Sequence, residues 1–147
     1  MSYIDLNYHM IFSTKHRRPV IGPEFMPRLR EYIGGILRNL GGSMLAANGP
    51  ADHIHIAARL DQKAATMDVL KEIKGSSSQW IHETVGQSDF AWQDGYAAFT
   101  VSHSGVAQVV AYIQRQLEHH RKQNFQEELI EFLRRHEIEY DERYIWS

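Results

Sequence analysis

Two histidines one residue apart, His53 and His55, lie in the short run Asp52-His53-Ile54-His55-Ile56-Ala57-Ala58. In an extended strand, side chains at positions i and i+2 leave the same face, so both imidazoles are expected on one side and the isoleucines beside them in a core on the other. Two imidazoles held side by side on a rigid strand make half of a divalent-metal site. The chain contains 9 histidines among 147 residues, so chance also produces such a pair, and two strand histidines with ordinary hydrogen bonds are the alternative interpretation.

A second polar pattern lies near residue 112, on a helix predicted from about Val106 to Lys122. The buried stripe of this helix comprises Val106, Val109, Val110, Ile113 and Leu117. A polar line runs beside that stripe, within about 40° around the helix axis, and comprises Tyr112, Gln116, His119 and Gln123. The line indicates either a functional surface or a boundary tyrosine followed by solvated side chains.

Composition limits the chemistry that a metal site here could use. There is no cysteine, which excludes disulfides, thiolate zinc sites and iron–sulfur clusters, so His, carboxylate or amide groups must hold any metal. A hydrophobic content of 43% with 23% charged residues is ordinary for a globular protein, and 147 residues predict one domain spanning 1–147. No apolar run exceeds about five residues and no signal peptide is visible, so we expect no membrane association and a cytoplasmic location.

The net charge of −2 does not by itself indicate a nucleic-acid-binding protein. The placement of charge is nevertheless uneven. Basic side chains cluster at one turn and on two predicted helices, as Lys15, Arg17 and Arg18, then Lys71 and Lys74, then Arg115, Arg121 and Lys122. Acidic residues concentrate between Glu127 and Glu142. This asymmetry allows a local phosphate-binding face, with a solvated mixed surface as the alternative.

The elements that would position these residues follow from hydrophobic periodicity and from helix-breaking residues. Strands are predicted at 3–13, 43–48, 53–60 and 96–102, and helices from Pro23 and Pro27 to Gly41, from an N-cap at Thr66 to about 84, at 106–122 and at 125–135. The strands at 43–48 and 53–60 are expected to pair as a hairpin, which places the histidine strand near the middle of a sheet. Gly75-Ser76-Ser77-Ser78 falls inside the second helix and indicates either close approach of some other group to the helix surface or a weak helix.

The order strand-helix-strand-strand-helix-strand matches the split ferredoxin-like plan. We therefore predict an α+β fold. It has a ferredoxin-like split β-α-β antiparallel sheet with helices on one face, plus a C-terminal tyrosine-bearing helix and a tail helix.

Several segments, taken in order, carry a resemblance to a known family. They are Tyr8-His9-Met10-Ile11-Phe12-Ser13-Thr14-Lys15-His16-Arg17-Arg18-Pro19, Asp52-His53-Ile54-His55, Leu70-Lys71, Lys74-Gly75-Ser76-Ser77, Trp92-Gln93-Asp94-Gly95-Tyr96, Tyr112-Ile113-Gln114-Arg115-Gln116, His119-His120 and Glu139-Tyr140-Asp141-Glu142-Arg143-Tyr144. In order and spacing they resemble the single-tyrosine transposases of the HUH nuclease superfamily from insertion sequences, and the related REP-associated tyrosine transposases. One departure is Ala51, where the family commonly has proline, and this affects turn rigidity more than chemistry.

The resemblance implies that His53 and His55 are ligands of Mg²⁺ or Mn²⁺, that Gln116 is the third protein ligand, and that Tyr112 is the nucleophile. A tyrosine four residues before a glutamine shares its helix face, so one rigid element delivers both to the strand histidines. Such an enzyme attacks phosphorus with the phenol, leaving a 5′-phosphotyrosine and a free 3′-OH on DNA. Residues that could orient a ligand or move a proton are Asp52, His119 and His120, with surface positions as the alternative.

The resemblance also implies partners. The family acts on single-stranded DNA with hairpins near the element ends, as a homodimer whose sites combine the histidines of one subunit with the tyrosine helix of the other. Candidate phosphate contacts are Lys15, Arg17, Arg18, Lys71, Lys74 and Arg115.

Two other functions are compatible with the sequence. A domesticated, non-catalytic hairpin-binding protein or regulator would bind DNA with strong salt dependence and no divalent requirement. A metal hydrolase, in which Tyr112 only packs, would release both DNA ends.

Overall fold

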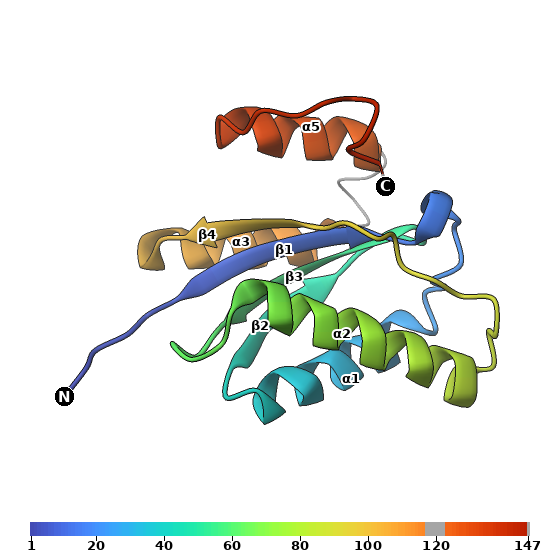
Figure 1. The fold of residues 1–147 in the computed structure, drawn as a ribbon, viewed down its shortest axis with the longest axis horizontal. Coiled ribbons are helices and arrows are strands. Elements are labelled where there is room, and N and C mark those ends of the chain that lie inside the picture. Colours follow the sequence, from blue (N-terminus) through green and yellow to red (C-terminus); the bar gives the residue numbers. More distant parts are fainter. Residues whose placement is uncertain (117–122, 147) are drawn as a thin grey trace.

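The computed structural model of the chain describes residues 1–116 and 123–146. Within these residues, four strands form one antiparallel sheet: β1 (Asn7–Ser13), β2 (Ser43–Asn48), β3 (His53–Arg59) and β4 (Ala97–Val101). The helices are α1 (Met26–Asn39), α2 (Thr66–Trp80), α3 (Val106–Gln114) and α5 (Phe125–Arg135), with shorter helical turns η1 (Lys15–Arg17), η2 (Ile81–Val85) and η3 (His103–Gly105). α1 and α2 cover one face of the sheet, and α3 and α5 lie on the other (Figure 1).

The strand order across the sheet is β2-β3-β1-β4. β3 pairs antiparallel with both β2 and β1, which confirms the predicted hairpin and the interior position of the histidine strand. β4 pairs antiparallel with β1 at the other edge. This arrangement of a split β-α-β unit confirms the predicted α+β, ferredoxin-like fold.

The main core lies between the sheet and the α1–α2 layer. Its fully buried members include Met10, Phe12, Leu29, Ile33, Leu37, Ile54, Ile56, Leu70 and Ile73. The core members from β1 and β3 are all even-numbered, and because side chains alternate along a strand, His53 and His55 lie on the opposite face. Burial of Ile54 and Ile56 therefore fixes the register that presents both histidines to α3 and α5.

Some element boundaries differ from the prediction. β1 begins at Asn7 rather than residue 3, because Asn7 pairs with Arg59 and Val101, the last residues of β3 and β4. Before Asn7, the Leu6 carbonyl still accepts a hydrogen bond from the Leu60 amide, just beyond β3. Thr66 lies inside α2, and Ala65 occupies the N-cap without a side-chain hydrogen bond. In the described part of the chain, no helix combines the length and apolar character needed to cross a membrane.

The Gly75–Ser78 segment does not interrupt α2, which continues to Trp80. Ser77 is fully buried, and its hydroxyl accepts a 3.0 Å hydrogen bond from the indole Nε1 of Trp92. Trp92 lies in the loop before β4 and packs edge-on against Phe12, with 4.8 Å between ring centroids. Close approach of this loop therefore accounts for the small residue at position 77.

Ser77→Ala should lower the free energy of unfolding by about 1–3 kcal/mol, because it leaves the buried Trp92 N–H without an acceptor. The measurement is urea unfolding followed by far-UV circular dichroism. Ser76→Ala, one residue earlier on the same helix, should change stability by less than about 0.5 kcal/mol. Equal effects of the two substitutions would contradict a specific role for the Ser77 hydroxyl.

Candidate metal centre and tyrosine

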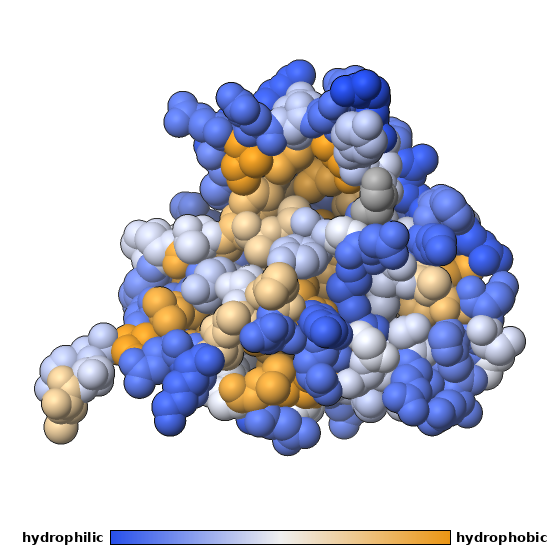
Figure 2. All heavy atoms as spheres, in the orientation of Figure 1, coloured by the Kyte–Doolittle hydropathy of each residue, from blue (hydrophilic) through white to orange (hydrophobic). Residues whose placement is uncertain are grey.

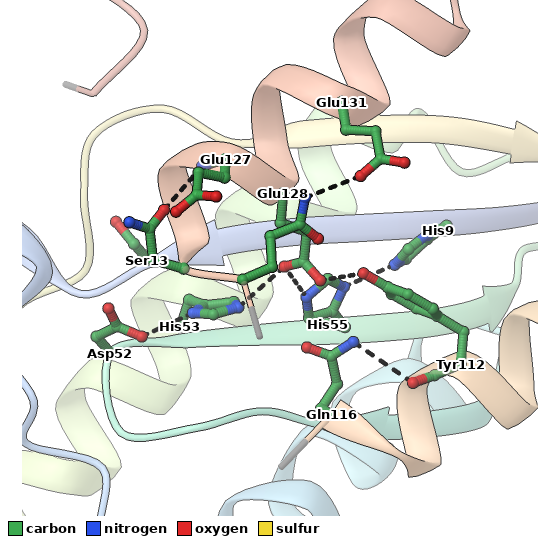
Figure 3. A network of polar contacts seen from close by, with 12 residues as sticks. His9, Ser13, Asp52, His53, His55, Tyr112, Gln116, Glu127, Glu128 and Glu131 are labelled. Atoms are coloured by element: carbon green, nitrogen blue, oxygen red, sulfur yellow. Dashed lines mark hydrogen bonds and ion pairs between the residues drawn. The ribbon is translucent and has the colours of Figure 1, made fainter. Parts of the chain in front are cut away.

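Three buried histidines lie on the odd-numbered face of β1 and β3. His53 and His55 have no exposed surface, and His9 of β1 is 2% exposed. Figure 3 shows these side chains on the sheet beneath α5, with Tyr112 of α3 beside them. The ring of Phe125, at the start of α5, is 4.6 Å from the ring of His53 between centroids. The histidine face is thus a closed layer between the sheet and α5.

His53 bridges two carboxylates. Its Nδ1 lies 2.7 Å from Asp52 Oδ1, and its Nε2 lies 3.2 Å from Oε1 of Glu128 on α5. Ionised carboxylates only accept hydrogen bonds, so both ring nitrogens carry protons in this arrangement. Burial lowers the pKa of His53, but the hydrogen bonds to Asp52 and Glu128 outweigh burial and raise it above its ordinary value. The Asp52 contact also fixes the orientation of the ring, as carboxylates do for metal-ligating histidines.

His55 shares the same carboxylate oxygen. Its Nε2 lies 2.8 Å from Glu128 Oε1, and its Nδ1 lies 2.9 Å from Nε2 of His9. One of the two facing ring nitrogens carries the proton, so His9 holds the His55 ring in place. Burial, and then the neighbouring His55, lowers the pKa of His9 to about 3. His9 is therefore a neutral partner that orients His55.

Tyr112 reaches Glu128 from α3, and its hydroxyl donates a hydrogen bond to Glu128 Oε2. Its ring centroid is 5.8 Å from that of His55. Burial, and then the hydrogen bond to Glu128, raises the pKa of the Tyr112 phenol well above its ordinary value. Gln116 is fully buried four residues later, and its side-chain amide donates to the Tyr112 carbonyl oxygen at 3.4 Å. One carboxylate thus connects the imidazole pair with the phenol.

His53, His55 and Glu128 have the spacing of a metal site. Their ligand atoms all lie within 4.8 Å of one another. Ligands about 2.1 Å from a shared ion are about 3 Å apart. Glu128 Oε1 lies 3.2 Å and 2.8 Å from the two Nε2 atoms, so an ion could replace the protons that these atoms share. Two imidazoles and a carboxylate are a donor set that fits a divalent metal.

The structure brings together most of the site residues expected from the sequence. Those that converge are Asp52, His53, His55, Tyr112 and Gln116. Their roles as ligands, nucleophile and orienting group stay predictions. His119 and His120 lie outside the described residues.

Sequence reasoning missed Glu128 and His9. Glu128 lies between Phe125 and Leu129 on the buried side of α5, and is itself 1% exposed. In the sequence, the sign of this buried Glu128 was a carboxylate that falls within the apolar stripe of its helix. His9 lies on the same face of β1 as Ile11, opposite the main core, and pairing of β1 with the histidine strand was the signal that could have found it.

The basic turn after β1 stays a candidate DNA contact. Lys15 and Arg18 are exposed, and Arg18 forms an exposed ion pair with Asp89 at 3.2 Å. The Arg17 guanidinium lies 5.9 Å from the centroid of a Trp146 ring, near the C-terminal end of the described chain. The turn therefore presents cationic groups at the end of the sheet where β3 begins, since the Thr14 amide donates to the Asp52 carbonyl.

The candidate DNA contacts on the helices differ in whether their charged groups are exposed or already hydrogen-bonded within the protein. Lys71 and Arg115 are exposed. The Lys74 ammonium donates to the carbonyls of Asp94 and Gly95 at 3.0 and 2.9 Å, and burial lowers its pKa. Lys74 thus holds the loop before β4, and its predicted DNA contact is untested.

In the metal-free protein, the free energy of unfolding should decrease because of His9 as the pH is lowered from 6.5 to 3. In the unfolded chain His9 binds a proton near pH 6.5, whereas buried His9 stays neutral down to about pH 3. The unfolded state therefore binds more protons in this window, and stability decreases as pH falls through it, by on the order of 4 kcal/mol in total.

His9→Gln keeps a hydrogen-bonding group and does not titrate, so it should lose less stability between pH 7 and pH 4. Urea unfolding in EDTA measures the difference. His103→Gln, at an exposed histidine, is the control. An identical loss in His9→Gln and in the unaltered protein would contradict burial of a neutral His9.

Comparisons with known proteins give consistent matches. A family profile described as "Transposase IS200 like" matches residues 2–116. The chain is 32% identical to the transposase for insertion sequence element IS200 of Salmonella typhimurium, over 76% of this chain and 76% of that protein. It is 26% identical to the ISDra2 transposase TnpA of Deinococcus radiodurans, over 76% of this chain and 84% of that protein.

Two solved structures share the fold. A crystal structure of a candidate transposase from Deinococcus radiodurans is 25% identical, with a TM-score of 0.62 over 78% of this chain and 93% of that one. A REP-associated tyrosine transposase bound to a REP hairpin is 18% identical, with a TM-score of 0.61 over 82% of this chain and 72% of that one. The second likeness concerns the fold alone.

Proposed function

Since the chain belongs to the family of IS200-like transposases, we propose that it cleaves and rejoins single-stranded DNA through a covalent bond to Tyr112. The resemblance read from the sequence is confirmed at the level of the family. The single-stranded DNA substrate, the nucleophile Tyr112 and the metal are proposed.

One observation carries it: the Tyr112 phenol and the imidazoles of His53 and His55 meet at a single carboxylate, that of Glu128. A phosphate group bound at that point would have the phenol on one side and the imidazole pair on the other. Cleavage by a positioned nucleophile requires this juxtaposition.

In the proposed reaction, the Tyr112 oxygen forms a bond to phosphorus and the bond to the departing 3′ oxygen breaks. The phenolic proton is lost and the 3′ oxygen gains one, so a 5′-phosphotyrosine and a free 3′-OH result. A 3′-OH then attacks the same phosphorus: its oxygen forms a bond to phosphorus and loses its proton, the bond between phosphorus and the Tyr112 oxygen breaks, and the phenol regains a proton. An ordinary phenol, with a pKa near 10, is a far better leaving group than an alkoxide, so rejoining needs no external energy source.

The proposed cofactor is Mg²⁺ or Mn²⁺, held by His53 and His55 with either Gln116 or Glu128 as third protein ligand. When bound, such an ion supplies a Lewis acid that draws charge from the scissile phosphate and the departing oxygen. His9 and Asp52 hold the two imidazole rings in the orientation that this binding needs.

The proposed partner is single-stranded DNA with hairpin ends. The REP-associated tyrosine transposase, which has a similar fold, binds a REP hairpin, and this choice agrees with that ligand. The basic turn at Lys15, Arg17 and Arg18 would contact the DNA backbone.

We further propose that residues 1–147 form one domain and that the chain works as a homodimer. The contacts of Tyr112 described above are made within one subunit.

The test is product analysis after incubation with Mn²⁺ and a pool of single-stranded oligonucleotides that each carry a stable hairpin flanked by random sequence. The expected product is DNA attached by its 5′ phosphate to protein, with a free 3′-OH on the other fragment. Peptide mass spectrometry should locate the attached nucleotide on Tyr112. Two free ends would instead indicate a hydrolase, and DNA binding without any cleavage would indicate a non-catalytic regulator.

A further inference from the structure

α5 covers the histidine face with an apolar seam. Phe125 and Leu129 are 3% and 6% exposed, and they cluster with Ile11 and Phe99 of the sheet. The outward side of α5 is hydrophilic, and hydrophobic atoms gather where it meets the sheet (Figure 2). α5 is therefore docked on the sheet by its buried side.

This docking closes the candidate site. His53, His55 and Gln116 have no exposed surface, and Glu128 has 1%. A DNA strand must bring a phosphate and its flanking sugars to Tyr112 and to both imidazoles. With α5 in place, Tyr112 is partly exposed, but both imidazoles are closed off from a sugar-phosphate backbone.

The Glu128 carboxylate lies where the reacting phosphate is needed. One of its oxygens is 3.2 and 2.8 Å from the two imidazole Nε2 atoms, and the other accepts the Tyr112 hydroxyl (Figure 3). A scissile phosphate would need the same contacts, with one oxygen at the metal ligands and the phosphorus beside the phenol. The carboxylate and the phosphate therefore compete for one position.

The sequence match of the family supports a role for α5 other than catalysis. The profile covers residues 2–116, which include the histidine pair, Tyr112 and Gln116. α5 begins at Phe125, outside that match. The groups proposed for the chemistry are thus complete without Glu128.

We propose that α5 is an autoinhibitory cap, in which Glu128 occupies the position of the scissile phosphate and must withdraw before single-stranded DNA can enter. In the open state Gln116 replaces Glu128 beside the histidines. This inference rests on the proposed function for the identity of the site. The apparent affinity for DNA is then the intrinsic affinity reduced by the fraction of molecules with α5 undocked.

The test measures DNA binding without chemistry, in EDTA, by fluorescence anisotropy of a labelled pool of single-stranded 30-mers of random sequence. Leu129→Ala weakens the seam and leaves every site residue in place, and it should lower the apparent Kd about tenfold or more. Leu37→Ala removes a buried leucine from α1 in the other layer and should leave the Kd unchanged. Circular dichroism verifies that both variants are folded.

Two further measurements do not depend on core substitutions. Glu128→Gln removes the charge that competes with phosphate and should also tighten binding. Hydrogen–deuterium exchange of the unaltered chain should show faster exchange in residues 125–135 when saturating DNA is added. The cap is overturned if α5 exchanges equally or more slowly with DNA bound. It is also overturned if Leu129→Ala and Leu37→Ala have the same Kd, including no binding by either.

Restoring Mn²⁺ separates the cap from the proposed function. A variant that binds DNA more tightly but forms no covalent adduct would support the cap and contradict the nucleophile. An adduct formed by the unaltered chain and lost in both Leu129→Ala and Glu128→Gln would assign Glu128 to the catalytic machinery and overturn the cap.

Discussion

Replacing Tyr112 by phenylalanine should abolish the covalent DNA–protein adduct, lowering its rate of formation by about a thousandfold or more. The substitution removes the only atom of this side chain that can bond to phosphorus. The ring itself packs beside His55 and Phe132, and phenylalanine preserves these contacts. The measurement is denaturing gel electrophoresis of protein incubated with labelled single-stranded DNA and Mn²⁺.

Tyr32→Phe is the matched control. Tyr32 lies on α1 in the opposite layer, where its ring stacks on Trp80 at 4.8 Å between centroids. This control should form the adduct at the rate of the unaltered chain. If Tyr112→Phe forms adduct as fast as Tyr32→Phe, the nucleophile is another residue and the proposed mechanism is wrong.

Loss of either strand histidine should lower the affinity for Mn²⁺ by about 100-fold or more. Loss of a group that only hydrogen-bonds to a metal ligand already lowers metal affinity by about 10–100-fold. His53→Ala and His55→Ala each remove one of the two imidazole Nε2 atoms that face Glu128 Oε1. Isothermal titration calorimetry of the metal-free protein measures this effect without DNA. His103→Ala, at an exposed histidine, should bind Mn²⁺ as the unaltered chain does.

The same titration distinguishes the two candidates for the third ligand. In the closed arrangement Glu128 contacts both imidazoles, so Glu128→Ala should weaken Mn²⁺ binding in the absence of DNA more than Gln116→Ala does. Unchanged Mn²⁺ affinity in both histidine variants would refute a metal site on β3. It would leave the three side chains as a hydrogen-bonded cluster.

The sequence by itself determined the local parts of this site. The alternation of Ile54 and Ile56 with His53 and His55 fixed which face each side chain takes, because the period of a strand is two residues. The order of strands and helices also determined the sheet, since a split β-α-β unit places the histidine strand inside it. Spacing of four residues placed Tyr112 and Gln116 on one side of their helix.

Only the tertiary structure decided what these residues meet. Glu128 is 73 residues from His55 in the chain, and nothing in the local pattern of α5 says against which surface its apolar side docks. The periodicity of Phe125 and Leu129 indicates a buried side, but docking depends on the shape of the sheet face that Ile11 and Phe99 complete. The closed state of the site is therefore a consequence of long-range packing, because only in the folded protein does the buried side of α5 bring a carboxylate between two imidazoles and a phenol.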